Sequence, residues 1–206
     1  MSTVNIVMLS HQSALSGAPK ILFEIATQLD REKFSRTVIC PEDGPLVQML
    51  NNKRIPVLVI KRHFRYKFPH SLQELIASFS GFISLINYIS QTSRFIKKEN
   101  PSFVHVNTSV EIPGSIACLI ARKPIFWHIH EIHPSKFKCW FATHWAILVS
   151  SRIIAVSQAV ADSLMSHPKV KVVHNCIDLI EFDNKMNHLP QQLPQSFTQF
   201  LRKWDY

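Results

Sequence analysis

The sequence KPIFWHIHEIHP, from Lys123 to Pro134, holds the clearest strand of this chain and its densest chemistry. Its apolar part, Ile125–Ile129, is rich in β-branched and aromatic residues and is bounded by prolines, as is typical of a buried strand. The carboxyl ends of parallel strands face the ligand crevice of an α/β fold. We therefore expect this strand to deliver four reactive side chains to one place: His128, His130, Glu131 and His133.

Short apolar runs alternate with helical patterns on both sides of this strand. The runs are Val4–Leu9, Thr37–Cys40, Val57–Ile60, Phe103–Val106, Arg152–Val156 and Val170–Val173. Alternation of this kind predicts a parallel sheet with right-handed crossovers. The predicted fold class is therefore α/β, a Rossmann-like parallel sheet of about seven strands with helices on both faces.

Composition limits the class of protein. The 206 residues suffice for one domain with a full hydrophobic core and are few for two. A formal net charge of +9 favours anionic partners such as phosphorylated ligands, nucleic acid or an acidic membrane surface. The four cysteines form no CxxC pair, which indicates reduced thiols. Since no secretory signal follows Met1, we expect a cytoplasmic protein.

Two segments bear on membrane contact. The segment Leu75–Ser93 carries no charge over 19 residues, near the length of a membrane-spanning helix. Its serines and amides favour a packed helix instead, and helical spacing predicts that one apolar face is buried. That predicted face consists of Leu75, Ile76, Phe79, Phe82, Ile83, Ile86 and Ile89.

The second segment, KRHFRYKFPH at residues 61–70, interleaves aromatic rings with cations. Such a loop suits an anionic lipid surface or a phosphorylated acceptor. A solvated loop with inward rings fits as well, and grooves for single-stranded nucleic acid use the same residue types. The cations of this predicted membrane or acceptor patch are Lys61, Arg62, Arg65 and Lys67.

Two further positions have both a structural and a functional interpretation. Gly17 either brings backbone amides to a phosphate at a helix N-terminus or only makes the turn before that helix. His105 lies within a predicted strand, where a histidine is more often a hydrogen-bonded core residue than a ligand.

Six motifs at the predicted strand ends resemble the N-terminal half of a family 4 glycosyltransferase of the two-domain GT-B fold. They are SGAP at 16–19, PEDGPL at 41–46, VHVNTS at 104–109, KPIFWHIHE at 123–131, IIAVSQAV at 153–160 and VVHNCID at 172–178. The resemblance covers Asn5–Phe182. It implies an acceptor-side domain at residues 1–182 and a polar linker at 183–206 toward a C-terminal donor domain missing from this chain. Cys176 departs from the pattern, because the family has glycine there.

The resemblance also implies a function. The chain would be the acceptor-binding half of a retaining glycosyltransferase of the hexosyltransferase type, inactive by itself. The whole enzyme would move a sugar from a nucleotide-sugar donor to a glycan or lipid-linked acceptor, in polysaccharide or glycoconjugate biosynthesis. It would need no cofactor besides the donor as co-substrate and would bind no nucleic acid. We expect it in the cytoplasm, peripherally on the inner face of an anionic membrane.

Site roles follow from the same resemblance. His130 would reach the transferred sugar, and Glu131 would orient that histidine or an acceptor hydroxyl. The residues implied to bind substrate or phosphate are Ser16, Gly17, Ala18, Asn107, Ser109, Ser157 and Asn175.

Two alternatives remain open. HIHEIH matches the histidine spacing of metallo-β-lactamase-like hydrolases at His128, His130 and His133, but Ile132 occupies the position of the metal-binding aspartate. We therefore expect no metal there. The other alternative is a non-catalytic binding or regulatory half-domain.

Overall fold

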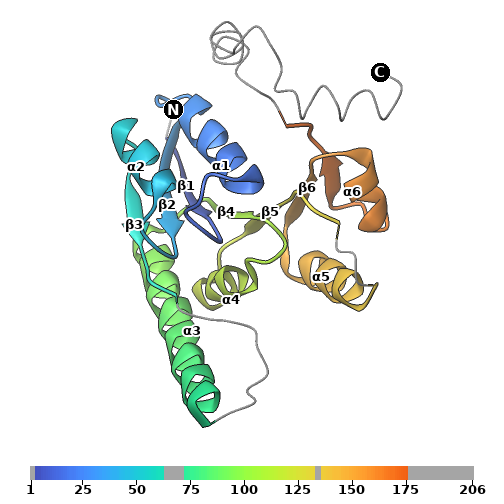
Figure 1. Cartoon of the computed structure of the whole chain (residues 1–206). Helices are drawn as coiled ribbons and strands as arrows, with labels where there is room; N and C mark the ends of the chain where they lie inside the picture. Colours follow the sequence, from blue (N-terminus) through green and yellow to red (C-terminus); the bar gives the residue numbers. More distant parts are fainter. Residues whose placement is uncertain (1–2, 63–71, 133–135, 176–206) are drawn as a thin grey trace, which may run out of the picture. The chain divides into compact units, whose positions relative to one another are not determined.

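The computed structural model describes residues 3–62, 72–132 and 136–175, and gives side chains throughout these ranges except at 72–79 and 136–138 (Figure 1). The chain divides into two units, residues 1–175 and 176–206, of which only the first is described below. Four positions of interest lie outside the described residues: Arg65, Lys67, His133 and Cys176. The predicted domain end at Phe182 also lies outside and stays a prediction.

Seven strands form one sheet in the order β3-β2-β1-β4-β5-β6-β7, and every neighbouring pair is parallel. The strands are β1 (Val4–Leu9), β2 (Phe34–Cys40), β3 (Val57–Val59), β4 (Phe103–Asn107), β5 (Ile125–Ile129), β6 (Arg152–Ala155) and β7 (Val170–Val172). The predicted Rossmann-like parallel sheet is confirmed.

Helices cover both faces of the sheet (Figure 1). They are α1 (Gly17–Gln28), α2 (Pro45–Asn52), α3 (Leu72–Glu99), α4 (Ile112–Ala121), α5 (Lys136–Val149) and α6 (Gln158–Ser163). Side chains of α1 and α2 pack in one core, while those of α3 to α6 pack in the core on the opposite face. This division follows from right-handed crossovers, because the strand order reverses direction after β3.

Alternation along each strand decides which side chains meet which helices. On β1, Val7 and Leu9 belong to the core under α3 to α6, whereas Ile6 and Met8 belong to the core under α1 and α2. The same rule applies to β5, where Trp127 packs in the core under α3 to α6. His128 therefore lies on the sheet face that carries α1.

The strand order also locates a crevice. Strands β1 and β4 are neighbours, but their following helices, α1 and α4, lie on opposite faces of the sheet. The two loops consequently diverge at the carboxyl ends of these strands. Open α/β sheets bind ligands at such a switch point.

The predicted buried face of α3 is wrong for three of its seven residues, while Ile89 packs against the core and the side chains of Leu75, Ile76 and Phe79 lie outside the described ones. Phe82, Ile83 and Ile86 are 53%, 46% and 50% exposed, and the buried residues lie further on: Tyr88, Thr92, Ser93 and Ile96. The reason is length. A helix of 28 residues extends about 42 Å, whereas a strand of five residues such as β4 extends about 17 Å. Only the second half of α3 therefore has sheet beneath it. None of the described helices combines the length and apolar character needed to cross a membrane.

Candidate functional site

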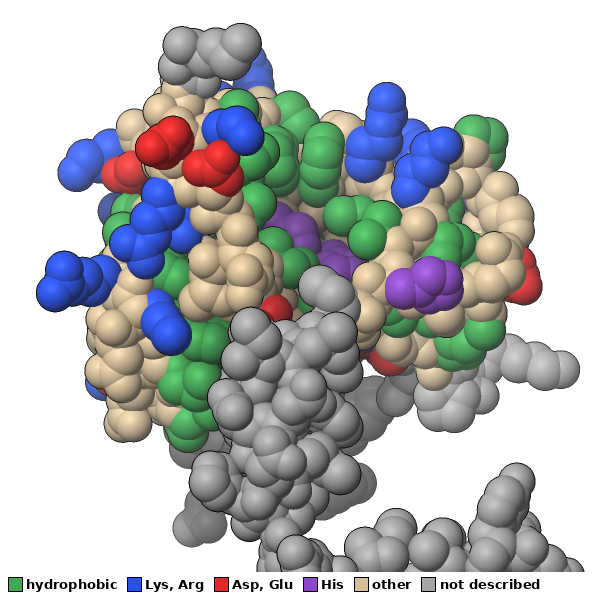
Figure 2. All heavy atoms as spheres, turned by 90° about the horizontal axis from the view of Figure 1, so that it is seen from above, with side chains coloured by type: hydrophobic (Ala, Val, Ile, Leu, Met, Phe, Trp, Pro, Cys, Tyr) green, Lys and Arg blue, Asp and Glu red, His purple; other side chains and the backbone are tan. Residues whose placement is uncertain are grey.

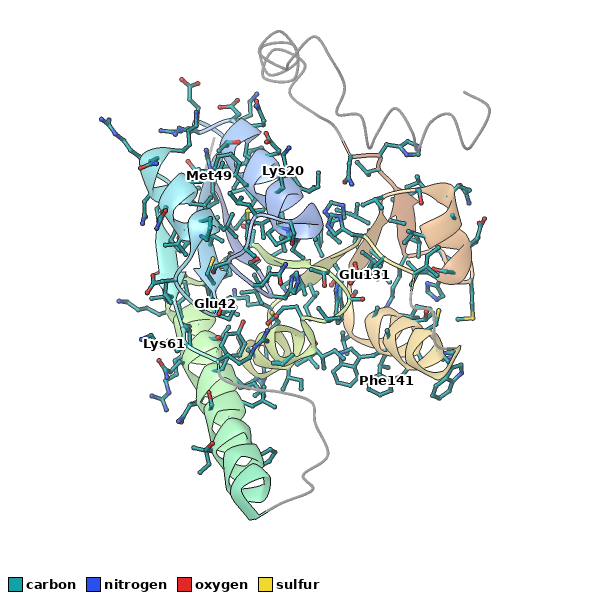
Figure 3. The ribbon with its side chains drawn as sticks, in the orientation of Figure 1. Lys20, Glu42, Met49, Lys61, Glu131 and Phe141 are labelled. Atoms are coloured by element: carbon teal, nitrogen blue, oxygen red, sulfur yellow. The ribbon has the colours of Figure 1, made fainter. Side chains whose placement is uncertain are left out.

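The carboxyl ends of β1, β4 and β5 bring together five polar residues: His11, Asn107, Ser109, His130 and Glu131. Figure 3 labels Glu131, which follows β5 by two residues. All of them except His11 were predicted from the sequence to belong to the site. The cluster lies at the switch point between β1 and β4.

Asn107 fixes the orientation of the His130 ring. The Asn107 side chain is fully buried; its Nδ2 donates to the carbonyl of Ala18 at 2.9 Å, and its Oδ1 lies 2.9 Å from His130 Nε2. Because a carbonyl can only accept, the amide nitrogen must face Ala18 and Oδ1 must face the ring. Nε2 therefore carries the proton, and Nδ1 of neutral His130 is left as the acceptor nitrogen.

Glu131 joins the ends of β4 and β5. Its Oε1 accepts from the backbone N–H and the hydroxyl of Ser109 at 3.0 and 2.6 Å, and its Oε2 accepts from the backbone N–H of His130 at 3.1 Å. Burial raises the pKa of Glu131, but hydrogen bonds from Ser109, Thr108 and the backbone of His130 outweigh it and leave the pKa below its usual value. The carboxylate is thus ionised, and it holds the backbone of His130.

His11 is the site residue that the sequence did not indicate. Its carbonyl accepts from Arg62 Nη2 at 3.2 Å, and its buried Nδ1 finds no hydrogen-bond partner among the described residues. Burial lowers the pKa of His11 more than the charge of Glu131 raises it. The pKa of His130 is lowered for the same reason, with a further contribution from His11. A single histidine in a polar loop has no spacing signal, so sequence patterns could not single it out.

Three imidazoles lie in a row on the sheet face that carries α1. His105 Nε2 and His128 Nδ1 are 3.4 Å apart, and the ring centroids of His128 and His130 are 4.1 Å apart. Burial lowers the pKa of His105 to about 4 and that of His128 to about 2, so both are neutral at pH 7. His105 is a core residue, as predicted. Figure 2 shows histidine side chains in a hollow of the surface, flanked by hydrophobic ones.

The described residues contain no group of three His, Cys, Asp or Glu side chains arranged to hold a metal ion. His133, the third histidine of the rival hydrolase motif, lies outside them. The absence of a metal therefore stays a prediction, which elemental analysis of the purified protein checks.

The first turn of α1 borders the cluster through Ala18. Ser16 precedes the helix with an extended backbone, and its hydroxyl accepts from Gln12 Nε2 at 2.7 Å. A side chain at Gly17 would meet no atom within 4 Å, and its φ is not positive. Neither packing nor backbone geometry therefore requires glycine at this position. Because Gly17 has no side chain, its backbone faces open space. The amides of Gly17 and Ala18 belong to the helix end that has no intrahelical acceptors.

Two predicted site residues lie apart from these hydrogen bonds. Ser157 caps α6, where its hydroxyl accepts from the backbone N–H of Val160 at 3.3 Å. Asn175 is exposed at the end of the first unit. Their predicted roles in the cleft stay predictions.

Arg62 does not belong to the predicted surface patch. Its side chain is 14% exposed, and its Nη1 donates to both oxygens of fully buried Glu111 at 3.1 and 3.0 Å. Tyr88 and the backbone of Gly114 donate to the same carboxylate at 2.8 and 3.2 Å. Lys61 is exposed and lies well apart from Glu131 (Figure 3). The sequence did not indicate this buried ion pair, because its members are 49 residues apart.

Comparison with known proteins identifies a family. Residues 15–181 match the model of Glycosyltransferase Family 4. No curated protein sequence matches the chain.

Solved structures share the fold. HepE of Anabaena, crystallised with UDP and glucose, is 24% identical with a TM-score of 0.66, covering 86% of this chain and 46% of HepE. A glycosyltransferase of Rickettsia africae is 17% identical with a TM-score of 0.65, covering 100% and 50%. MurG of Acinetobacter baumannii is 14% identical with a TM-score of 0.63, covering 85% and 47%. The chain thus spans about half the length of these proteins.

Proposed function

This chain belongs to glycosyltransferase family 4, and we propose that it is the acceptor-binding half of a retaining enzyme of that family. The whole enzyme would transfer a hexose from a nucleotide sugar to a glycan or lipid-linked acceptor, in the synthesis of a polysaccharide or glycoconjugate. The observation that carries the proposal is the oriented His130 ring at the switch point, held by Asn107 and adjoining the open end of α1.

A nucleotide sugar suits the open end of α1. Helix N-termini bind phosphate through unpaired amides and the helix dipole. The bare backbone at Gly17 leaves room for a diphosphate. HepE, which shares the fold, was crystallised with UDP and glucose and with UDP-glucose. We assign the diphosphate of the donor to the amides of Gly17 and Ala18.

The cluster suits the sugar. As the bond to the diphosphate breaks, positive charge develops on the sugar ring and negative charge on the leaving group. Preorganised dipoles and charges stabilise such a transition state without a protein nucleophile. The acceptor nitrogen of His130 can take a hydrogen bond from a sugar hydroxyl, while ionised Glu131 provides negative charge within the same cluster.

A transfer assay tests the role of His130. In the chain joined to a C-terminal donor domain, with UDP-glucose as donor, we expect His130→Ala to lower turnover about 100-fold or more, the effect of losing one positioned transition-state contact. His144→Ala, at an exposed position on α5, is the matched control and should retain full turnover. Full turnover of His130→Ala would contradict the proposed site.

We also propose that the protein meets an anionic membrane through α3, α4 and α5. Large hydrophobic side chains are exposed on all three helices: Phe82, Ile83, Ile86, Leu119, Ile120, Trp140, Phe141 and Leu148. The helices adjoin, because α3 packs against α4 and Trp145 of α5 donates to Ser115 of α4 at 3.0 Å. Exposed apolar groups in such number mark an interaction surface.

Charge on these helices favours anionic lipid as the partner. Among their described side chains, Glu99 is the single acid, whereas α3 ends with Lys97 and Lys98. Apolar side chains that enter the interface and cations that meet lipid phosphates together bind acidic bilayers.

A further inference from the structure

A pocket separate from the candidate site lies at the other end of the strands. It has a volume of about 220 Å³ and is lined by Arg31, Ser35, Arg36, Arg54, Ile55 and Pro56, which we call the arginine pocket. Ser35 is the second residue of β2, and Pro56 directly precedes β3, so the pocket lies at the amino ends of these strands. The candidate site lies at the carboxyl ends, roughly one strand length of about 20 Å away.

Three arginines from three segments line this pocket. Arg31 comes from the turn between α1 and β2, Arg36 from β2 itself, and Arg54 from the turn after α2. No acidic side chain is among the residues that line the pocket. The described ion pairs use neither Arg31 nor Arg36 nor Arg54. The local positive charge is therefore not neutralised by these pairs.

Arg36 is the buried member of this group. Arg36 is 7% exposed. Its Nε donates to the carbonyl of Ala26 at 2.8 Å, and its Nη1 donates to the carbonyl of Phe34 at 3.2 Å. Buried Nη2 finds no hydrogen-bond partner among the described residues. Burial and the nearby charge of Arg31 both lower the pKa of Arg36, which indicates a cation that lacks compensation.

Capping of helix ends explains part of this arrangement. Arg36 donates to a carbonyl in the last turn of α1, and Arg31 Nη2 donates to the carbonyl of Lys53 after α2 at 2.9 Å. Cations are favourable at helix C-termini. These contacts do not explain the unpaired Nη2 of Arg36, the presence of Arg54 in the lining, or the volume of the pocket.

We propose that the arginine pocket binds an oxyanion of the phosphate class, distinct from the donor of the transfer reaction. Guanidinium groups offer paired donors that match phosphate oxygens, and such charge-assisted hydrogen bonds are among the strongest in proteins. An oxyanion supplies acceptors for Nη2 of Arg36 and neutralises the adjacent guanidinium groups. The pocket is also much larger than one water requires. The phosphate is either that of a soluble ester or that of a lipid headgroup.

Titration with inorganic phosphate tests the proposal on the 206-residue chain. Sodium phosphate is added by isothermal titration in chloride buffer of matched ionic strength, so that general screening is constant. We expect saturable binding to the parent and about tenfold or greater weakening in Arg31→Gln and in Arg54→Gln, since each loses charge-assisted hydrogen bonds. Arg94→Gln, at an exposed arginine on α3, is the matched control and should bind like the parent.

Arg31→Gln and Arg54→Gln change exposed side chains, so their thermal unfolding should match that of the parent and exclude misfolding as the cause. Absence of saturable heat with the parent, or equal weakening in Arg94→Gln, overturns the proposal. Sedimentation with vesicles of phosphatidylglycerol or of phosphatidylcholine then identifies the source. Loss of phosphatidylglycerol binding in both pocket variants indicates a lipid headgroup, while unchanged vesicle binding with lost phosphate binding indicates a soluble ester.

Discussion

The proposed chemistry depends on a neutral, oriented His130, and the surrounding side chains supply both properties. Asn107 determines which ring nitrogen carries the proton, because its own amide is fixed by the carbonyl of Ala18. Burial keeps the pKa of His130 below its usual value despite the nearby Glu131. The site thus presents a hydrogen-bond acceptor beside an ionised carboxylate, an arrangement that suits a sugar that becomes positive during transfer.

The buried histidines make folding stability depend on pH. In the folded chain the pKa of His105 is about 4 and that of His128 about 2, against about 6.5 in the unfolded chain. The unfolded state therefore binds more protons below pH 6.5, so stability is fully present above that pH and falls as the pH drops toward 4 and below. We expect urea unfolding at pH 7, 6 and 5 to show this loss, up to about 1.4 kcal/mol per pH unit for each histidine.

Two variants identify the source of this pH dependence. His128→Phe keeps a buried ring without a titrating group and should make the dependence shallower, with the remainder coming from His105. His144→Phe changes an exposed histidine and should leave it as in the parent. An equal dependence in all three proteins would show that other groups are responsible.

Sequence reasoning reached these residues only in part. The strand pattern predicted that His130 and Glu131 lie at a strand end, and the family resemblance added Asn107 and Ser109 to the site. Their hydrogen bonds depend on side-chain rotamers, which no pattern specifies. Glu131 accordingly binds the backbone N–H of His130 and the hydroxyl of Ser109 and not the His130 ring, while its predicted alternative role toward an acceptor hydroxyl stays a prediction.

At the scale of elements, a buried ion pair joins the segment after β3 to two helices. Arg62 follows β3, Tyr88 lies on α3, and Glu111 is the N-cap of α4, where it also accepts from the backbone N–H of Gly114. The pair thus positions the start of α4 beside the loop that bears His11, whose carbonyl Arg62 also contacts.

Removing one partner of this pair should destabilise the fold strongly. Arg62→Met leaves the carboxyl of Glu111 buried without its cation, and we expect a loss of about 3–5 kcal/mol in the free energy of unfolding. The pKa of Glu111 is already raised by burial and is held down mainly by Arg62, so it should rise further. The double variant Arg62→Met with Glu111→Leu should recover part of the loss, as chemical denaturation can measure. A single variant as stable as the parent would contradict the role of the pair.

The exposed half of α3 carries the membrane prediction. We expect Phe82→Ser with Ile86→Ser to reduce sedimentation with phosphatidylglycerol vesicles several-fold, because apolar side chains that would enter the bilayer interface are removed. Met165→Ser, at an exposed apolar residue after α6, is the control and should leave sedimentation unchanged. Unimpaired binding of the α3 double variant would exclude this half of α3 as the contact.

The positions of strands and helices were more predictable than the burial of their side chains. Apolar runs located every strand of the described sheet to within a few residues, because strands buried on both faces are continuously apolar. The apolar periodicity of α3 predicted a helix but not how much of it is covered. A periodic pattern shows which side chains share a face, whereas coverage depends on the neighbouring sheet, which here is much shorter than the helix.

At the scale of the whole molecule, right-handed crossovers explain the two helix layers, whereas alternation does not specify at which strand the path reverses. A right-handed path that reverses after β3 gives the observed sheet and places β1 beside β4. The division between this half and a donor half does not follow from such rules. It rests on family membership and on the fact that the chain covers 46% of HepE. The proposed donor, acceptor and stereochemistry of the reaction therefore concern the whole two-domain enzyme.

The last prediction separates folding from catalysis. The described unit has a covered seven-stranded sheet with a hydrophobic core on each face, so residues 1–206 should unfold in one cooperative thermal transition. The proposed donor contacts of this unit are limited to the amides at the start of α1 and to His130 beside the transferred sugar. We therefore expect isothermal titration with UDP-glucose to show weak or no binding, and incubation with the donor to transfer no sugar. Tight binding by this chain would mean that the open end of α1 forms a complete donor site, and the proposed division of labour between two halves would be wrong.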